Sequence, residues 1–528
     1  MQKISSRFGF LIAFAAATAG VIHAQGRSAP DWTTDGADAQ RSSWIAVDPW
    51  ISIDTMPQFT LVWKLKVDNE PRQMNALTAP SSMANLNSFR GFKSLVFVGG
   101  SAYNVYAIDY DFGTLFWKTH FNYSSGITEY MGSPACPGGM TAGVVRPTSV
   151  TPTLQLPFMG FARPPRPAKG EVGEPGKGAA GLTVDVPGRG RGAGAGGRGA
   201  PPPVAAAPPP AGRGRGLNAV FAMGADGIVR ALNPNNADAV MPPAKFLPPN
   251  AQVTGLIHAD GFMYAVTSSA CGSAPDAVWA MDVERDERPV VMWKSGGAPV
   301  SAPAFGPDGT LYVTVGEGTS AYANSVVALA AKTLTVKDWI TLPGAAFRSA
   351  PVVLIDENAI RIAAAAGDGR LYIVDAGSLG GADHKSPAFV APASLRTAVE
   401  GLSAWRDNRG TRGILASTRD GNGNGAIVAF RFDAKKGSAA IEEAWTSRGL
   451  VRPQPAAIMN GVVFALSAGT ASSPAVLYAL HPATGNEIWT SGNTITSFAT
   501  AGLSTGTGQL FVVTHDNTVW SFGIPLPN

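Results

Sequence analysis

A repeated segment constrains the fold of this chain more than any other feature of its sequence. The stretches Val105–Trp117 and Leu477–Trp489 share one spacing, in which Gly follows Ala by six residues and Trp follows the same Ala by ten. Each copy begins as an alternating strand, turns where Gly113 or Gly485 can adopt a positive φ at low cost, and ends in a second strand that carries Trp. Because a large ring at a fixed position suits packing between repeated units, we expect these Trp side chains to be structural.

Weaker copies of the segment extend the repeat over most of the chain. Their anchors lie about 42 to 55 residues apart, which is the period of a four-stranded propeller blade. Three copies lead to a Trp, and three more are shorter: Val278–Asp282 with Trp293, Val326–Leu329 with Trp339, Ile427–Phe430 with Trp445, and then Ile228–Leu232, Leu371–Asp375 and Val519–Phe522. The repeat therefore predicts an all-β chain with four strands in each unit.

The number of units follows from the same anchors. We expect an eight-bladed β-propeller, or a seven-bladed one if Ile228–Leu232 or Leu371–Val374 is not a blade strand. The last unit has no Trp strand after Phe522, but the N-terminal segment Phe59–Leu65 contains one with Trp63. That strand would complete the last blade and leave no open sheet edge, so the ring would be closed by the N-terminal strand.

This repeat resembles the blade of the pyrroloquinoline-quinone-type propellers, the quinoprotein alcohol dehydrogenase-like family. The segment that contains Asp31, Trp32, Gly36, Asp38 and Arg41 is similar to the N-terminal segment of those dehydrogenases. The resemblance runs from about Asp31 to Phe522 outside one insert, and it implies the propeller fold. It leaves function open, because the family includes dehydrogenases, assembly scaffolds and binding proteins.

The first residues have the composition of a secretory signal. Lys3 and Arg7 precede an apolar run, Phe8–Val21, that is short for a membrane span, and Ala24 ends a small-residue cleavage site. We expect residues 1–24 to be a signal peptide, residues 25–528 to form one propeller domain, and the protein to be periplasmic or secreted. The alternative is a retained membrane anchor; the mature chain has no later stretch that predicts a transmembrane helix.

Residues 157–216 differ in composition from the rest of the chain. They are rich in Gly, Pro, Ala and Arg, as in Gly188–Gly192 and Gly212–Gly216, and they lie between strands predicted at Arg146–Leu154 and Ala219–Met223. Such a segment has little that could form a core, so we expect a disordered insert within the propeller. Runs of Arg and Gly can bind polyanions, but in an exported protein we expect a solvated linker and no nucleic acid partner.

The chain has two cysteines, Cys136 and Cys271. They fall in two loop types that open on the same face of a propeller, and their units are neighbours. An exported protein can keep a disulfide, so the two residues form either a Cys136–Cys271 bridge or two separate thiols.

Three units have an arginine just before their first strand: Arg146, Arg348 and Arg452. First strands line the central channel of a propeller, and the loops that lead into them surround one mouth. Three guanidinium groups there would suit a small anionic ligand with several carboxylates, and pyrroloquinoline quinone is a tricarboxylate. The alternative is that each arginine pairs with a nearby acid or lies in solvent.

The chemistry expected of a quinone enzyme is incomplete in this sequence. Glu317 and Asn324, in one loop on the face of the arginines, are candidate calcium ligands, although they also fit plain loop residues. The chain has no Cys-x-x-Cys-His motif and no adjacent Cys pair. Two functions therefore remain open: a quinone-dependent oxidoreductase or quinone-binding descendant, and a non-enzymatic periplasmic scaffold for protein or peptide partners.

Overall fold

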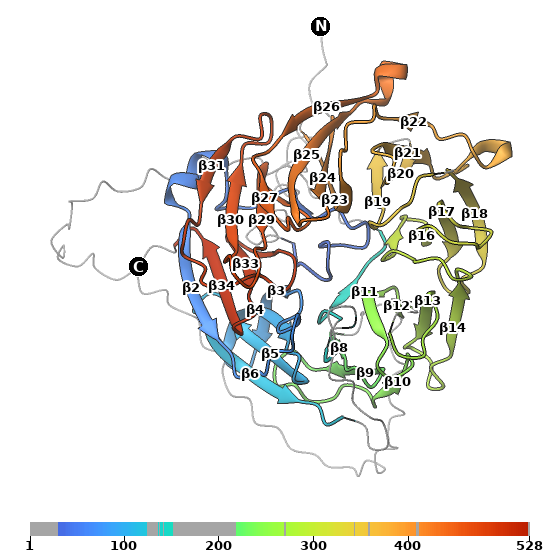
Figure 1. Ribbon diagram of the computed structural model, residues 1–528. Coiled ribbons are helices and arrows are strands. Elements are labelled where there is room, and N and C mark those ends of the chain that lie inside the picture. Colours follow the sequence, from blue (N-terminus) through green and yellow to red (C-terminus); the bar gives the residue numbers. More distant parts are fainter. Residues whose placement is uncertain are drawn as a thin grey trace, which may run out of the picture. The chain divides into compact units, whose positions relative to one another are not determined.

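The computed structural model describes residues 30–123, 136, 138–140, 142–151, 218–268, 271–342, 344–356, 359–407 and 411–525. These residues form eight sheets arranged as a ring, and each sheet is one blade (Figure 1). The predicted signal peptide, residues 1–24, and the whole of the predicted insert, residues 157–216, lie outside the described residues. Among the described residues, no helix is long and apolar enough to cross a membrane.

The blades are numbered here in chain order, and each runs from the channel outwards. The first four contain these strands: blade 1, β3 (Ser81–Ser88), β4 (Gly91–Gly99), β5 (Asn104–Asp109) and β6 (Thr114–His120); blade 2, β8 (Val220–Met223), β9 (Ile228–Leu232) and β10 (Ala244–Lys245); blade 3, β11 (Gln252–Ala259), β12 (Phe262–Ser268), β13 (Ala277–Asp282) and β14 (Val290–Lys294), with β7 (Pro147–Thr148) beside β11; blade 4, β15 (Ala304–Phe305), β16 (Thr310–Val315), β17 (Ser325–Ala330) and β18 (Val336–Thr341).

The other four blades follow the same order. Their strands are: blade 5, β19 (Val352–Asp356), β20 (Ala359–Ala365), β21 (Leu371–Asp375) and β22 (Phe389–Val390); blade 6, β23 (Ala398–Arg406), β24 (Arg412–Arg419), β25 (Asn424–Phe432) and β26 (Ile441–Thr446), with β27 (Leu450–Val451) paired to β25; blade 7, β28 (Ala457–Met459), β29 (Val462–Ser467), β30 (Val476–Leu480) and β31 (Glu487–Thr490), with β1 (Trp44–Ile45) beside β28; blade 8, β32 (Ser504–Gly506), β33 (Gln509–Val513), β34 (Thr518–Gly523) and β2 (Thr60–Lys66).

The prediction of eight blades is confirmed. The two anchors that left the count open are β9 and β21; β9 is the middle strand of the three-stranded blade 2, and β21 is the third strand of blade 5. The ring closes as expected, because the N-terminal strand β2 pairs antiparallel with β34 and supplies the fourth strand of blade 8. The described helices are short 3-10 turns at Ile53–Gln58, Gly381–Asp383 and Ala434–Ala439.

The repeated Trp and Gly residues join neighbouring blades. The indole N–H of Trp445 donates to the carbonyl of Pro482 in the next blade at 2.8 Å, and that of Trp63 donates to Tyr110 at 2.6 Å. A Cβ on Gly485 would lie 2.4 Å from the Trp445 ring, and Gly485 has a φ of +70°. The Trp of one blade therefore covers the Gly turn of the next, which explains why the sequence repeats the two residues together.

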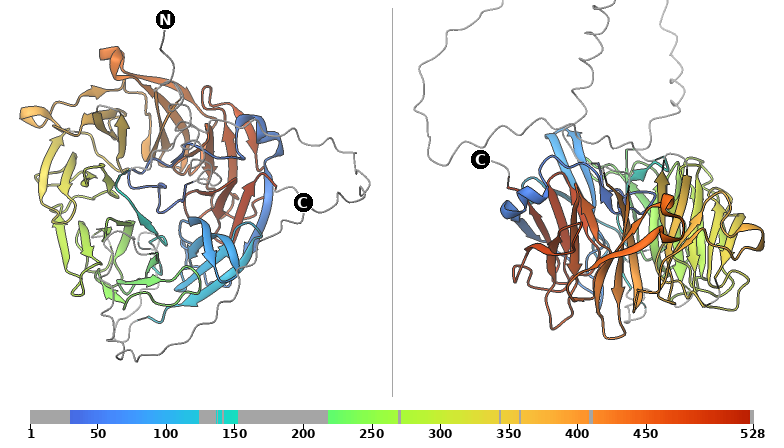
Figure 2. Two further views of the ribbon diagram at one scale, coloured as in Figure 1. Left: turned by 180° about the vertical axis from the view of Figure 1, so that it is seen from behind. Right: turned by 90° about the horizontal axis from the view of Figure 1, so that it is seen from above.

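The N-terminal segment Asp31–Ile51, named here the inner belt, runs around the inside of the ring. It hydrogen-bonds to the innermost part of every blade in turn, with these partners: Ser82, Arg146, Leu256, Phe305, Val353, Ala404, Ile458 and Gly508. The residues joined in blades 4, 6, 7 and 8 lie in the second half of the first strand or in the turn that follows. The belt therefore lies toward the channel end where first strands finish (Figures 1 and 2).

Blade 2 differs from the prediction at its inner edge. The sequence predicts a first strand over Arg146–Leu154, of which residues 152–154 lie outside the described part of the chain; among the described residues, Val145 alone forms a bridge to β8, at Phe221. The chain then crosses to blade 3, where β7 pairs parallel with His258 and Ala259 of β11. Pro147 has no N–H to donate, so this residue cannot serve as a full ladder position in the middle of a sheet.

Candidate functional site

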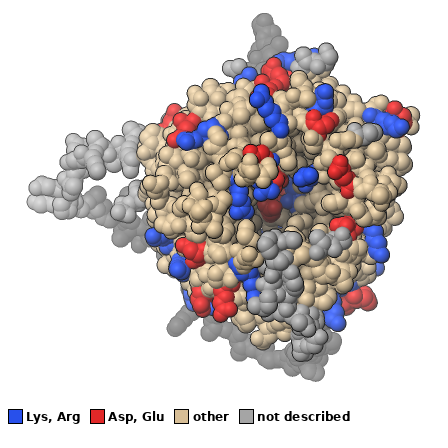
Figure 3. Space-filling model, viewed as in Figure 1, with Lys and Arg blue, Asp and Glu red and all other residues tan. Residues whose placement is uncertain are grey.

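The face where first strands begin carries a hollow at the centre of the ring, and Lys, Arg, Asp and Glu side chains gather around and inside it (Figure 3). First strands start at this face, and the turns between second and third strands, such as Asp420–Gly423, lie on it too. We call this hollow the mouth. Its charged groups come from three sources: the loops that lead into the first strands, here called lead-in loops, the ends of β23 and β24 at this face, and the inner belt.

Arg452, Arg419 and Glu400 form the main charged cluster of the mouth. Arg419 Nη2 lies 2.9 Å from Glu400 Oε1, and both side chains are about one-third exposed, at 35% and 34%. Burial lowers the pKa of Arg452 below its ordinary value, the positive charge of Arg419 lowers it further, and Glu400 opposes this. Two guanidinium groups thus share one carboxylate, which leaves an excess of positive charge in a half-buried place.

Local backbone features explain how these side chains meet. Glu400 sits at a bulge in β23, because the register with β24 shifts between Val399 and Gly401. A bulge redirects a side chain and bends the strand. Arg452 has a φ of +51°, and its N–H donates to the carbonyl of Gly423, the residue at the tip of the β24–β25 turn. This turn is a hairpin in which the Asp420 carboxylate accepts hydrogen bonds from the N–H groups of Asn422 and Asn424.

The floor of the mouth is built by the inner belt. Arg41 is almost fully buried; its Nε donates to the carbonyl of Pro303 at 2.6 Å and its Nη1 to the carbonyl of Asp35 at 2.9 Å. The Asp35 carboxylate, 60% exposed, lies 4.0 Å from Arg41 Nη1 and faces Gly502 in the lead-in loop of blade 8. Asp38 is buried beside Arg41, and burial raises its pKa. The floor therefore presents one exposed carboxylate above a buried guanidinium.

The three arginines predicted at the mouth lie in three different environments. Arg146 is buried and forms an ion pair with Asp31 of the inner belt, and its Nη1 also donates to the carbonyl of Ser82. Arg348 is exposed in the lead-in loop of blade 5, and Arg452 belongs to the cluster with Arg419. The charge of Arg146 is thus matched inside the fold, while those of Arg348 and Arg452 remain at the surface of the mouth.

The two candidate calcium ligands lie in one loop but in different environments. Glu317 is exposed, whereas the side-chain oxygen of Asn324 accepts a hydrogen bond from the N–H of Ala346 at 3.0 Å. Asn324 also has a φ of +56°, typical of a residue that shapes a loop. In the part of the chain that the structure describes, no three His, Cys, Asp or Glu residues are grouped to hold a metal ion.

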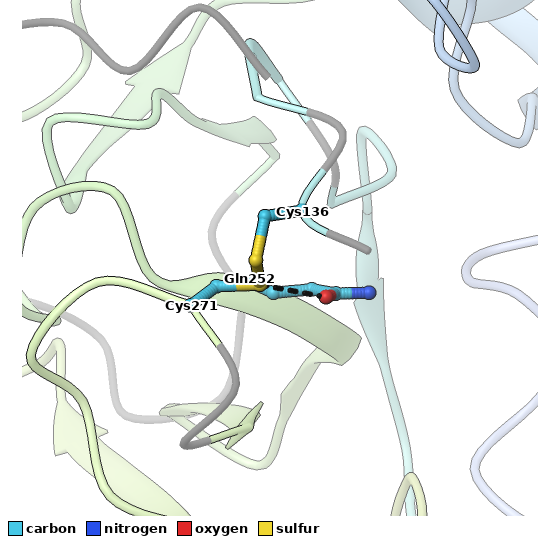
Figure 4. Close-up of a disulfide and its surroundings, with 3 residues drawn as sticks. All are labelled: Cys136, Gln252 and Cys271. Carbon is cyan, nitrogen blue, oxygen red and sulfur yellow. Dashed lines mark hydrogen bonds between the residues drawn. A yellow bond between two sulfur atoms is a disulfide. The ribbon is translucent and has the colours of Figure 1, made fainter. Parts of the chain in front are cut away.

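Cys136 and Cys271 form a disulfide, with Cα atoms 5.7 Å apart (Figure 4). The bond joins the loop before blade 2 to the β12–β13 loop of blade 3. The two cysteines thus lie in neighbouring blades and form the bridge, the first of the two alternatives that the sequence left open. Gln252, the first residue of β11, lies beside it with Oε1 at 3.1 Å from Cys271 Sγ. The bridge therefore stands at the start of a channel-lining strand.

Sequence reasoning missed several residues of the mouth. Arg419, Glu400 and Asp35 carry no motif, and Glu400 is placed by a bulge that the repeat does not encode. Arg41 and Asp38 belong to the segment that resembles the N-terminal segment of the dehydrogenases, so the resemblance could have pointed to these two residues.

Neither a family model nor a curated protein sequence matches the chain. Solved structures do resemble it in fold. The quinohemoprotein alcohol dehydrogenase from Comamonas testosteroni has a TM-score of 0.58 at 13% identity, over 94% of this chain and 81% of that one. The enzyme ADHIIG from Pseudomonas putida HK5 gives 0.57 at 12% over the same shares, and a europium-containing methanol dehydrogenase gives 0.54 at 9%, over 93% and 98%. The chain therefore shares the propeller fold of these dehydrogenases.

Proposed function

We propose that the protein is an exported binding propeller whose mouth takes a small ligand with several carboxylates. The observation that carries the proposal is the cluster of Arg452, Arg419 and Glu400. Glu400, the carboxylate near Arg452, is already paired with Arg419, and burial disfavours the positive charge of Arg452. An anion placed between the two arginines would relieve both effects and would be bound through charge-assisted hydrogen bonds.

Pyrroloquinoline quinone is one ligand of this chemical class. Its carboxylates fit Arg452 and Arg419, and the exposed Arg348 offers a third guanidinium on the same face. The residues present do not fit a calcium ion beside the quinone, because the Asn324 oxygen is already hydrogen-bonded and Glu317 is the single carboxylate of that loop. We therefore propose binding of the carboxylates and derive no redox step from this site.

Calorimetric titration tests the proposal directly. The ligands are pyrroloquinoline quinone and, as a plain tricarboxylate, citrate, each added to the wild type and to Arg452→Gln and Arg419→Gln. We expect wild-type binding that weakens with salt, and a loss of about tenfold or more in affinity in each variant, because each removes one charge-assisted contact. Arg448→Gln is the matched control, since Arg448 pairs with Glu487 on the outer edge of blade 7.

The outcomes separate the candidate functions. Absence of heat and of any thermal shift with both ligands would sink the proposal. Dye-linked oxidation of alcohols by the quinone-bound protein, assayed with and without added calcium, would support the other candidate function, a quinone-dependent oxidoreductase. If no small ligand binds but cross-linked periplasmic partners are lost on charge reversal of Arg348 and Arg452, the mouth serves the alternative function, a scaffold for protein partners.

A further inference from the structure

Blade 1 exposes a group of large apolar side chains at its turns. Phe89, Phe92 and Phe112 are 72%, 81% and 70% exposed, and Leu115 is 48% exposed. Phe89 and Phe92 flank the β3–β4 turn, whereas Phe112 and Leu115 belong to the β5–β6 turn and the start of β6. Burying an aromatic ring is strongly favourable, so several such rings left in water together indicate an interaction surface.

The two turns lie at the same end of the blade. In an antiparallel four-stranded sheet, the turn after the first strand and the turn after the third strand both fall at the edge where first strands finish. This is the edge opposite the mouth. In Figure 2 the β3–β4 hairpin, in light blue, extends beyond the neighbouring strands, so this turn projects from the ring of blades. We call Phe89, Phe92, Phe112 and Leu115 the aromatic tip.

The corresponding turns of blades 7 and 3 do not have this character. In blade 7, which contains the sister copy of the repeat, the two turns are Asn460–Gly461 and His481–Asn486. Blade 3 has Asp260–Gly261 and the charged run Val283–Pro289 at these places. Because the repeat builds sound blades with polar turns, the rings of the aromatic tip are not needed for construction.

Two basic side chains lie against the rings of the aromatic tip. The Arg90 guanidinium lies 5.1 Å from the centre of the Phe89 ring and 5.2 Å from that of Phe116, and Lys93 Nζ lies 5.4 Å from the centre of the Phe112 ring. The other lysines of blade 1 and β2 stand further from the tip, because Lys64, Lys66 and Lys118 lie beyond the middle of β2 and β6, and Lys118 is paired with Asp68 at 2.8 Å.

Two acids lie at the same end of the blade. Asp109 is paired with Lys93, at 2.8 Å. Burial raises the pKa of Asp111, and the nearby charge of Asp109 raises it further, so its negative charge is disfavoured there. Arg90, which is itself exposed, is therefore the cation that the aromatic tip offers to an anionic partner.

We propose that the aromatic tip docks on an anionic phospholipid surface. The exposed rings can enter the boundary between headgroups and acyl chains, while Arg90 contacts a lipid phosphate. A second copy of this chain fits less well, because two copies of the tip would bring their Arg90 side chains together. Docking through this edge would leave the mouth facing away from the membrane, accessible to its ligand.

Vesicle co-sedimentation tests the proposal, with all proteins produced identically so that the N-terminal segment is common to them. The vesicles are phosphatidylcholine alone and phosphatidylcholine with phosphatidylglycerol. We expect the wild type to bind the anionic vesicles, and Phe89→Ser with Phe92→Ser to lose about tenfold or more in partitioning for each ring removed. Arg90→Gln should weaken binding to anionic vesicles alone. Val290→Ser with Met292→Ser, an exposed apolar pair of β14 (38% and 37%), is the matched control.

A second measurement reports insertion itself. In Phe92→Trp the new indole should be quenched by brominated phosphatidylglycerol, beyond any quenching of the wild type. Absence of wild-type binding to anionic vesicles, or equal binding by the serine variants, overturns the proposal. The proposal is also overturned if self-association, or capture of a protein partner, requires Phe89 and Phe92 while vesicle binding does not require them. Equal thermal unfolding of wild type and variants ensures that the comparison concerns folded proteins.

Discussion

The contact between two neighbouring blades, here called a seam, is made by different residues in different parts of the ring. Between blades 6 and 7, the Trp445 ring covers Gly485 and donates to Pro482, as the repeat predicts. Blade 2 has no Trp in its short outer strand β10. Its seam with blade 3 is instead held by the Cys136–Cys271 disulfide, by the parallel pairing of β7 with β11, and by the Phe221 and His258 rings, stacked at 4.5 Å.

The difference shows where a repeat can be altered. A Trp on a Gly turn closes a seam from outside, at the rim of the ring. The seam that lacks this Trp is closed nearer the channel, by covalent and aromatic contacts between segments far apart in sequence. Substitutions should therefore destabilise the two seams for different reasons. At the blade 2–3 seam the loss should depend on the disulfide and on pH, and at the blade 6–7 seam it should depend on the packing of Trp445 on Gly485.

The largest effect is expected at the blade 2–3 seam. Cys136→Ser with Cys271→Ser should lower the free energy of unfolding by about 4 kcal/mol, because the bridge closes a loop across 135 residues and so restricts the unfolded chain. Urea-induced unfolding measures the loss. The reduced wild type should match the double variant, and an unchanged midpoint in both would mean that β7 and the stacked rings hold this seam without the bond.

At the blade 6–7 seam, Trp445→Ala should cost about 3 kcal/mol, since the ring is 8% exposed and its indole N–H is hydrogen-bonded. Reduction of the disulfide should leave this loss unchanged if the two seams act independently. Gly485→Ala should also destabilise strongly, because its Cβ would lie 2.4 Å from Trp445. Gly461→Ala is the control, with a φ of +82° but open space around it, so its cost should be limited to about 1 kcal/mol of backbone strain.

The blade 2–3 seam should also respond to pH. Burial lowers the pKa of His258 to about 4, and neither ring nitrogen has a hydrogen-bond partner in the structure. The unfolded chain takes up a proton near the ordinary pKa, so the stabilising contribution is complete above about pH 6.5 and is lost as the pH falls toward 4. Between about pH 7 and pH 5, we expect a loss of roughly 2 kcal/mol.

His258→Phe isolates this contribution. The variant keeps a ring stacked on Phe221 but cannot take up a proton, so its pH dependence of urea unfolding should be flatter than that of the wild type. Parallel curves for the two proteins would contradict a neutral His258 in the fold.

The smallest effect is expected at the mouth, which belongs to neither seam. Glu400→Gln should change the free energy of unfolding by less than about 1 kcal/mol, because its ion pair with Arg419 is partly exposed. Its effect on ligand binding should be opposite in sign to that of Arg419→Gln, since it removes the carboxylate that competes with an anion. A large stability loss in thermal unfolding would instead make Glu400 part of the scaffold.

The sequence allowed the ring to be predicted because its signals are local. The Ala, Gly and Trp spacing marks third and fourth strands, and Trp63 identified the strand that closes blade 8. The same placement of loops allowed the Cys136–Cys271 bridge but left two separate thiols equally open, and the structure has the bridge.

The mouth depends on contacts that no local pattern records. Arg146 pairs with Asp31, a residue 115 positions away, and this removes it from the ligand-facing charges. The crossing of β7 to blade 3 and the bulge at Glu400 likewise arise from tertiary packing. The exposure of Phe89 and Phe92 is also a property of the folded blade, because apolar residues in a hairpin equally fit a buried core.

The inner belt gives the propeller a cooperativity that stacked repeats lack. In a linear array each unit touches only its neighbours, so units can melt one after another. Here one continuous segment is hydrogen-bonded to the inner edge of all eight blades, and the buried Asp48 fixes its end through the N–H groups of Trp50, Ile51 and Gly508. Unfolding of one blade would free its part of the inner belt and so weaken the hydrogen bonds of the belt to the neighbouring blades. The ring should therefore unfold as one unit.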